Sequence, residues 1–291
     1  MPSQLKTFGK TGAKVSEIGV GTFYDTGWII RSKIFGPPRT AGKRRVEAIR
    51  AAIESGINLI DTAEIYGSES LVGEAIKGFD RESLFLATKV FPTNFSPSRL
   101  ERSCDRSLRE LGVKYIDLYQ LHFPLGSKRT VSALRTMEKL IDSGKIRYIG
   151  ISNFSLEQTK MAVESLKEHP LVSTQMHFSL IRRDVEYSGL LKYCIENNIS
   201  ILAYYPLGHG KLLSSDYASN AAVRKISEKY GNKTLSQIVL NWFISKFENV
   251  YPIPRASNPD HVRENSGSMG WKMEADDIAQ LEKVFLEKTE H

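Results

Sequence analysis

The chain has 291 residues, of which 41% are hydrophobic and 25% are charged. This composition is typical of a globular protein, and no segment approaches the apolar length that a membrane-spanning helix needs. The formal net charge of +7 comes from scattered basic residues with one short run at positions 43–45, so it does not predict nucleic-acid binding. With two cysteines and no clustered histidines, the sequence indicates neither a disulfide framework nor a metal site. The first six residues lack the pattern of a secretory signal, which favours a cytoplasmic location.

Apolar strands and amphipathic helices alternate along the chain. Four glycines between short alternating runs, from Leu5 to Phe23, predict a β-hairpin followed by a first strand. The pattern then predicts strands near 57–60, 84–88, 116–121, 148–151, 173–176, 199–203 and 250–252. Helices are predicted near 43–55, 69–77, 97–111, 130–143, 156–168, 185–197, 220–230, 235–245 and 276–287. This alternation is typical of parallel βαβ units. We therefore expect one α/β domain over residues 1–291, a (β/α)8 TIM barrel with an N-terminal β-hairpin cap and a C-terminal helix.

A doubly wound nucleotide-binding sheet is the competing architecture. Its Gly-x-Gly-x-x-Gly turn is absent, because Gly19-Val20-Gly21 lacks the third glycine and does not lead directly into a helix. If a dinucleotide binds, it is therefore held without this glycine-rich turn.

Polar side chains follow three of the predicted strands. Asp61 ends an apolar run and is followed by Tyr66, while Lys89 and His122 end the next two runs. In an α/β barrel all the strand C-termini open onto one face, so these four residues can meet there. Taken singly, each has an ordinary structural explanation as a turn cap, a solvated lysine or a core histidine. Together they indicate proton transfer by a phenol that has a cation beside it.

Several ordered motifs carry a resemblance to a known family. They lie at residues 56–76 (with Asp61-Thr62-Ala63 and Tyr66-Gly67), 108–122, 149–154, 175 and 203–208. Across essentially the whole chain, this order resembles the aldo-keto reductase superfamily. The resemblance implies reversible hydride transfer between a nicotinamide and the carbonyl of an aldehyde or ketone. It also implies that Tyr66 donates the proton, that Lys89, held by Asp61, lowers the phenol pKa, and that His122 orients the carbonyl.

The resemblance also implies where the cofactor binds. The nicotinamide contacts are assigned to Ser152, Asn153, Gln175 and Tyr204, and the pyrophosphate loop contributes Leu207, Gly210 and Leu212. The remaining cofactor positions are Gly21, Thr22, Arg255, Asn258, Glu264 and Asn265. Arg255 is a plausible partner for a 2′-phosphate, but His261 stands where many relatives carry a second arginine. We therefore expect NADPH, with NADH possible. The basic run 43–45 is interpreted as a solvated helix face whose positive field attracts an anionic dinucleotide.

The substrate is not readable from the sequence beyond a small-molecule carbonyl compound. Loops at 24–35, 91–95 and 122–125 are expected to line the mouth, with apolar walls from Tyr24, Trp28, Phe91 and Phe123. Two other functions stay open: a cofactor-binding module that resembles the potassium-channel β subunits, and a sugar or alcohol dehydrogenase that works oxidatively. Neither a membrane nor nucleic acid is expected as a partner, and the oligomeric state is not predicted.

Overall fold

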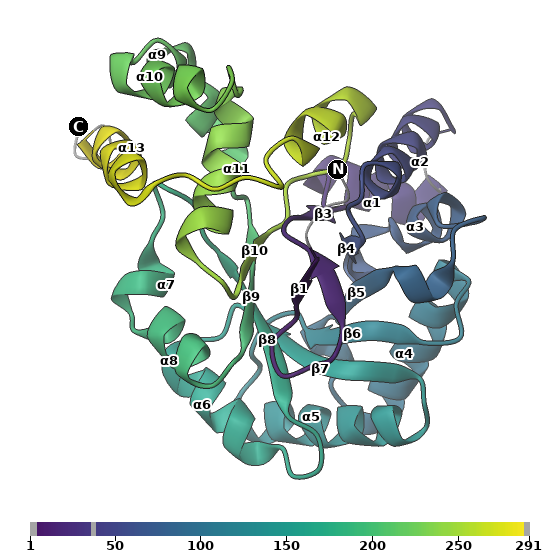
Figure 1. The fold of residues 1–291 in the computed structure, drawn as a ribbon. Coiled ribbons are helices and arrows are strands. Elements are labelled where there is room, and N and C mark those ends of the chain that lie inside the picture. The colour runs from purple at the N-terminus through teal and green to yellow at the C-terminus, as the bar shows by residue number, and fades with distance from the viewer. Residues whose placement is uncertain (1–4, 36–38, 288–291) are drawn as a thin grey trace.

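The computed structural model of the chain describes residues 5–35 and 39–287, and eight parallel strands form its centre. They follow one another around the sheet in chain order (Figure 1). The strands are β3 Gly19–Gly21, β4 Leu59–Asp61, β5 Phe85–Val90, β6 Ile116–Leu121, β7 Ile146–Ser152, β8 Leu171–His177, β9 Ser200–Tyr204 and β10 Val250–Pro252. The sheet closes beyond β10, where the Gly21 N–H donates to Pro254 O and the Gly21 carbonyl accepts from Ala256 N, both at 2.9 Å. The predicted barrel is therefore confirmed.

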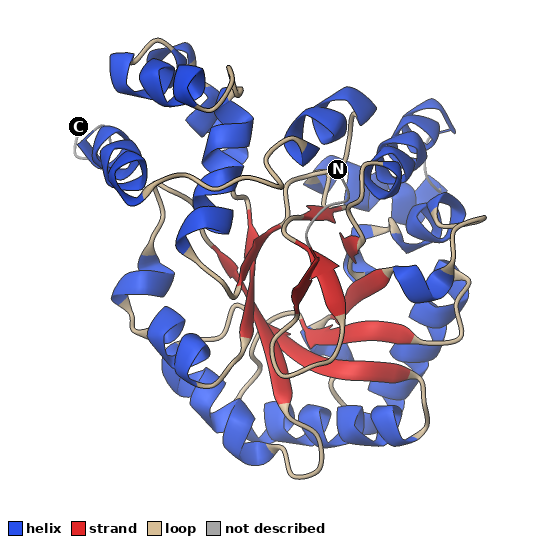
Figure 2. Cartoon of the chain, in the orientation of Figure 1, coloured by secondary structure: helices blue, strands red, loops and turns tan. Residues whose placement is uncertain are grey.

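Helices cover the outside of the barrel (Figure 2). They are α1 Thr26–Phe35, α2 Arg39–Glu54, α3 Glu69–Ala75, α4 Pro97–Leu111, α5 Ser127–Asp142, α6 Leu156–Ser165, α7 Asp184–Tyr187, α8 Leu190–Glu196, α9 Ser215–Ala218, α10 Ala221–Lys229, α11 Leu235–Lys246, α12 Pro259–Ser266 and α13 Ala275–Glu287. Short 3-10 turns are η1 Glu64–Tyr66, η2 Arg81–Ser83, η3 Pro92–Asn94 and η4 Gly208–Leu213. In α4, the buried residues Leu100, Cys104 and Leu111 recur at helical spacing and face the barrel. Within the described segments, no helix combines the length and apolar character that crossing a bilayer requires.

An antiparallel hairpin of β1 Leu5–Thr7 and β2 Lys14–Ser16 precedes the barrel. Phe8, at its turn, is fully buried and contacts the rings of Phe85 and Tyr251 at centroid distances of 4.8 and 5.3 Å. Because Phe85 begins β5, the hairpin covers the N-terminal ends of the strands. The C-terminal ends, where barrel enzymes carry their sites, are left to the loops.

The structure adds helices α9 and α12 to those predicted from the sequence, and it differs from the predictions at two further segments. Residues 24–35, expected as a loop, contain helix α1, and the Asp25 carboxylate accepts from the Trp28 N–H at 2.7 Å as an N-cap side chain does. The single helix expected at 185–197 is two short helices, α7 and α8, because Gly189 between them adopts a left-handed φ of 78°. The prediction about a secretory signal concerns the start of the chain, of which residues 1–4 lie outside the described ranges.

Candidate active site

The four residues predicted to carry the chemistry lie together at the C-terminal ends of β4, β5 and β6. Asp61 ends β4, Lys89 lies in β5, Tyr66 ends the η1 turn, and His122 follows β6. Lys89 Nζ lies 2.7 Å from Asp61 Oδ2 and 2.8 Å from the Thr62 carbonyl. The Tyr66 hydroxyl lies 3.3 Å from His122 Nε2. Residues up to 61 positions apart in the sequence thus form one cluster.

The ion pair of Lys89 and Asp61 is enclosed, with side-chain exposures of 0% and 3%. Its second carboxylate oxygen, Asp61 Oδ1, accepts from Gln175 Nε2 at 2.9 Å and from Gln120 Nε2 at 3.4 Å. A buried charge is tolerated where each of its atoms is paired in this way. Sequence analysis missed Gln120, although the parallel register that sets Lys89 opposite Gln120 brings both side chains into the barrel. It had assigned Gln175 to the cofactor, and in this structure its amide holds Asp61.

The surroundings of Tyr66 raise the pKa of its phenol. Burial raises the pKa of the Tyr66 phenol well above 10.0, and the negative charge of Asp61 raises this pKa further. The net effect of these surroundings is to raise the phenol pKa, and the expectation that Lys89, whose Nζ lies 4.9 Å from the centre of the Tyr66 ring, opposes this shift stays a prediction. Tyr66 accordingly keeps its proton at neutral pH.

The pKa values of His122 and Lys89 are lowered. Burial, and then the positive charge of Lys89, lower the pKa of His122 to about 2, so the imidazole is neutral. Burial also lowers the pKa of Lys89, against the opposing charge of Asp61. Within the described residues, His122 Nδ1 has no hydrogen-bond partner. A neutral imidazole beside the phenol can donate one hydrogen bond to a carbonyl oxygen.

An anchor outside the four residues fixes the position of the η1 turn. Glu64 begins this turn, and its Oε1 accepts from the Phe91 N–H at 2.6 Å and from Asn94 Nδ2 at 3.0 Å. Its other carboxylate oxygen accepts from Ser103 of α4. The carboxylate thus ties the turn that carries Tyr66 to the loop after β5. No sequence motif singled out Glu64, because its partners come from separate elements.

Aromatic side chains surround the Tyr66 and His122 pair. Phe23 contacts Tyr66 edge-to-face at a centroid distance of 5.1 Å. Phe123 is 41% exposed and stacks on His122 at 4.8 Å, and Phe91 contacts both His122 and Phe123. Phe91 and Phe123, which were predicted as pocket walls, therefore lie beside His122, and Phe23 is a neighbour that sequence reasoning missed.

Tyr24 and Trp28 occupy a different place from the one predicted. They are 3% and 5% exposed and contact each other edge-to-face at 5.4 Å. Both rings also lie against the Arg45 guanidinium of α2. The residues expected as walls of an open pocket are instead buried in a cluster around an arginine.

The residues assigned to the nicotinamide form one hydrogen-bonded group beside His122. Asn153 adopts a left-handed φ of 65°, and its amide donates to the His122 carbonyl and to Ser152 Oγ, both at 3.0 Å. The Tyr204 hydroxyl donates to Asn153 Oδ1 at 2.8 Å. His177, at the end of β8, stacks on the Tyr204 ring at 5.2 Å. The group is thus positioned by the C-terminal ends of β7, β8 and β9, next to the strands that carry the active residues.

The residues assigned to the phosphates lie where β9 and β10 end. After β9, the chain carries left-handed φ angles of 52° at Tyr205, 57° at His209 and 88° at Gly210, a conformation that can gather backbone N–H groups around an anion. Leu207 occupies the position just before the η4 turn in this loop, and Leu212 is fully buried.

The positions assigned beyond the phosphate loop are mixed in exposure. Arg255 is exposed, and its Nη1 donates to the Tyr24 carbonyl at 3.0 Å. Thr22 is fully buried, and its hydroxyl hydrogen-bonds to the Asp61 carbonyl and to Ser68. The other assigned positions are Gly21, where an added Cβ would lie 3.1 Å from the Ile253 carbonyl, Asn258, which caps α12, and Glu264 and Asn265 within α12.

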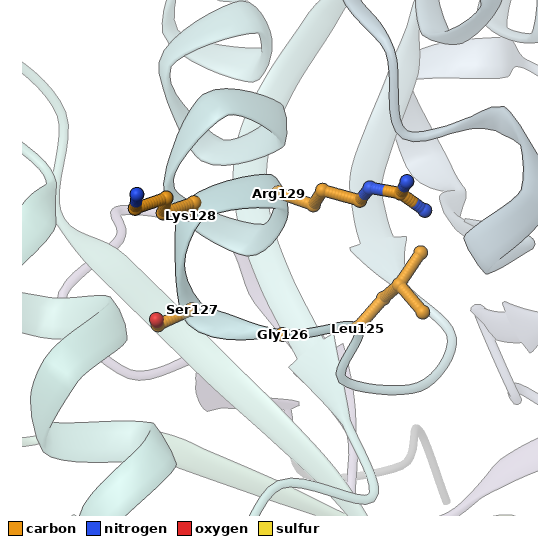
Figure 3. A pocket seen from close by; sticks show the side chains of 5 residues that line it. All are labelled: Leu125, Gly126, Ser127, Lys128 and Arg129. Atoms are coloured by element: carbon orange, nitrogen blue, oxygen red, sulfur yellow. The ribbon is translucent and has the colours of Figure 1, made fainter.

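A surface hollow of about 410 Å³ lies at the start of α5, lined by Leu125, Gly126, Ser127, Lys128 and Arg129 (Figure 3). Its two basic side chains, Lys128 and Arg129, extend away from each other. None of the four clustered residues lines it, so this hollow is not where the chemistry is placed. Among the described residues no group of three or more His, Cys, Asp or Glu could hold a metal ion.

Comparisons with known proteins agree with this geometry. Residues 17–285 match the model of the aldo/keto reductase family. Methylglyoxal reductase YeaE from Escherichia coli (strain K12) is 34% identical over 92% of this chain and 90% of its own length. Glyoxal reductase from Bacillus subtilis (strain 168) is 31% identical over 84% of each chain. A crystal structure of an aldo-keto reductase from Klebsiella pneumoniae in complex with NADPH has a TM-score of 0.84 at 31% identity, over 98% of this chain and 96% of that one.

The chain belongs to the aldo/keto reductase family. It is therefore an NAD(P)H-dependent oxidoreductase built on a TIM barrel. The residues present fit such a cofactor. The loop after β9, with its left-handed φ angles, can offer backbone N–H donors to phosphates, and the exposed Arg255 after β10 offers a cation.

Proposed function

We propose that the chain reduces an aldehyde or ketone to an alcohol with NADPH, and that Tyr66 donates the proton. The observation that carries this proposal is the Tyr66 hydroxyl, 3.3 Å from a neutral His122 imidazole and beside the buried pair of Lys89 and Asp61. A carbonyl oxygen that accepts from both the phenol and the imidazole is polarised and held in place. The reduced nicotinamide supplies the hydride.

The roles of the residues follow from their charge states. Tyr66, whose pKa burial raises, holds its proton until negative charge develops on the carbonyl oxygen and then transfers it. The nearby ammonium of Lys89 stabilises the phenolate that remains, because an opposite charge favours the ionised form. His122 is neutral and donates without competing for the proton. Because a phenol with a raised pKa stays protonated at neutral pH, Tyr66 is in the form that carbonyl reduction requires.

The substrate class we propose is a small dicarbonyl compound. Two relatives are named for methylglyoxal and for glyoxal. The walls beside His122 are the aromatic rings of Phe91 and Phe123, with Phe23 against Tyr66. A flat compound with few atoms fits between such rings, and its second carbonyl increases the electrophilicity of the first.

The test follows NADPH oxidation at its nicotinamide absorbance with methylglyoxal, glyoxal and a panel of aldehydes and ketones. Tyr66→Phe removes only the hydroxyl, so turnover is expected to fall at least about 10²-fold, by the usual size of general acid catalysis. NADPH affinity, measured by calorimetry, is expected to stay near that of the wild type. Tyr187→Phe is the matched control, because Tyr187 is 74% exposed on α7.

Two outcomes would contradict the proposed activity or its proton donor, and a third would contradict only the substrate class. Near-normal turnover by Tyr66→Phe would remove Tyr66 from the role of proton donor. If the wild-type protein binds NADPH but no compound in the panel causes NADPH oxidation, the result would favour a cofactor-binding module over an enzyme. Turnover confined to large carbonyl compounds would reject the dicarbonyl class alone.

A further inference from the structure

Arg45 of α2 lies against two aromatic rings that meet edge-to-face, and it has unused hydrogen-bonding capacity. Its guanidinium carbon lies 3.4 Å from the centre of the Trp28 ring and 3.8 Å from that of Tyr24. Its Nη1 is buried and, within the described residues, has no hydrogen-bond partner. A buried donor without an acceptor is costly, and a guanidinium presents five donors in a planar fork. The position therefore suits an acceptor that the protein itself does not supply.

Arg255 brings a second positive charge to the same place. Its Nη1 donates to the carbonyl of Tyr24, the residue whose ring lies against Arg45. Burial lowers the pKa of Arg45, and the charge of Arg255 lowers it further, against the opposing effects of Tyr24 and Asp25. The Asp25 carboxylate is exposed and accepts from the Trp28 N–H, and no ion pair joins it to Arg45 in the described part of the chain. An anion between the two arginines would relieve their repulsion.

The two arginines come from elements that meet where the barrel closes. Tyr24 follows β3, and Arg255 follows β10. A parallel β-bridge pairs Gly21 with Arg255 where the two strands end. Helix α2, which carries Arg45, packs against α12, the helix that begins just after Asn258 (Figure 1). This is the end of the barrel to which the adenosine phosphate was assigned from the sequence.

We infer that Arg45 and Arg255 together bind the 2′-phosphate of NADPH, with Arg45 supplying the second arginine that the turn after β10 lacks. Two guanidinium groups can each make paired hydrogen bonds to phosphate oxygens. The rings of Tyr24 and Trp28 hold the Arg45 guanidinium by cation–π contact, which reduces the ordering cost on binding. Tyr24 and Trp28, which were expected to line the substrate pocket, then contribute to cofactor binding by holding Arg45. The inference requires dinucleotide binding and does not depend on the role of Tyr66.

The test is calorimetric titration of the intact protein with NADP⁺ and with NAD⁺, which differ only in the 2′-phosphate. Arg45→Gln is expected to weaken NADP⁺ binding by about ten- to a hundredfold, the usual loss for hydrogen bonds to a charged group. NAD⁺ binding is expected to change less than about threefold, which also shows that the site is folded. The fragment 2′,5′-ADP, which lacks the nicotinamide, is expected to follow NADP⁺.

Arg44→Gln is the matched control, because it removes the same charge from an exposed neighbour on α2. An equal loss of NADP⁺ affinity in this control would mean that Arg45 acts only through the general field of the helix. Equal weakening of NADP⁺ and NAD⁺ by Arg45→Gln would assign Arg45 to the pyrophosphate or to packing and overturn the inference. If Arg45→Gln fails to fold, Arg45→Lys keeps the charge without the planar fork, and unchanged discrimination between the two cofactors in that variant would also overturn it.

Discussion

Replacing Lys89 by methionine tests whether the buried ion pair is needed for both stability and chemistry. Lys89 Nζ lies 2.7 Å from Asp61 Oδ2, and neither side chain is more than 3% exposed. At an effective dielectric constant of about 20, the attraction across this distance is about 6 kcal/mol, and much of it is offset by the desolvation of both charges. Removing the lysine alone leaves the carboxylate desolvated and uncompensated. We expect the free energy of unfolding to fall by about 3–5 kcal/mol.

The second variant in this test is Lys89→Met combined with Asp61→Asn. It removes both charges and keeps an oxygen that can accept from Gln175. The double variant is expected to be more stable than Lys89→Met by at least about 2 kcal/mol, because no uncompensated charge is left buried. Urea unfolding followed by circular dichroism at pH 7 gives the four free energies of the wild type, Lys89→Met, Asp61→Asn and the double variant, and a turnover assay on the folded variants shows whether activity is lost.

Three results would refute this reasoning. A loss below about 1 kcal/mol for Lys89→Met would mean that the carboxylate is not trapped in a low-dielectric site. A double variant whose loss equals the sum of the two single losses would mean that the charges do not act as a pair. If Lys89→Met stays folded and turns over normally, the cation is not needed beside Tyr66.

Two further predictions concern pH dependence and cofactor choice. Burial raises the pKa of Glu69 from 4.5 to about 7, and its carboxyl accepts from Thr88 Oγ1 at 2.6 Å. Between pH 4.5 and about 7 the folded protein keeps this proton, whereas the unfolded chain releases it. The contribution of Glu69 to the free energy of unfolding is therefore fully present below pH 4.5 and is lost as the pH rises to about 7, a change of about 3 kcal/mol. Glu69→Gln should lack this slope, and equal slopes in urea unfolding of wild type and variant at pH 5 and 8 would contradict the prediction. Arg255→Ala should weaken NADPH about ten- to a hundredfold and leave NADH almost unchanged. Equal weakening of both cofactors in fluorescence titrations would mean that Arg255 only braces the loop through the Tyr24 carbonyl. His261→Gln tests whether that imidazole carries the contact instead.

The sequence by itself determined the order of the elements and the four residues at the strand ends. Hydrophobic periodicity is a local property, so α4 and β6 have the bounds that were predicted for them. Because parallel strands all end on one face of a barrel, the positions of the strand ends alone predict that Asp61, Lys89 and His122 lie together.

The tertiary structure decided which neighbouring side chain faces which environment. Successive residues of an extended chain point to opposite sides, and here Phe23 contacts Tyr66 while Tyr24 is buried against Arg45. Contacts such as those of Gln120 with Asp61 join separate strands, and no local pattern encodes them. The direction of the Tyr66 pKa shift depends on burial by the surrounding elements and on the charge of Asp61, so it could be determined only from the assembled site.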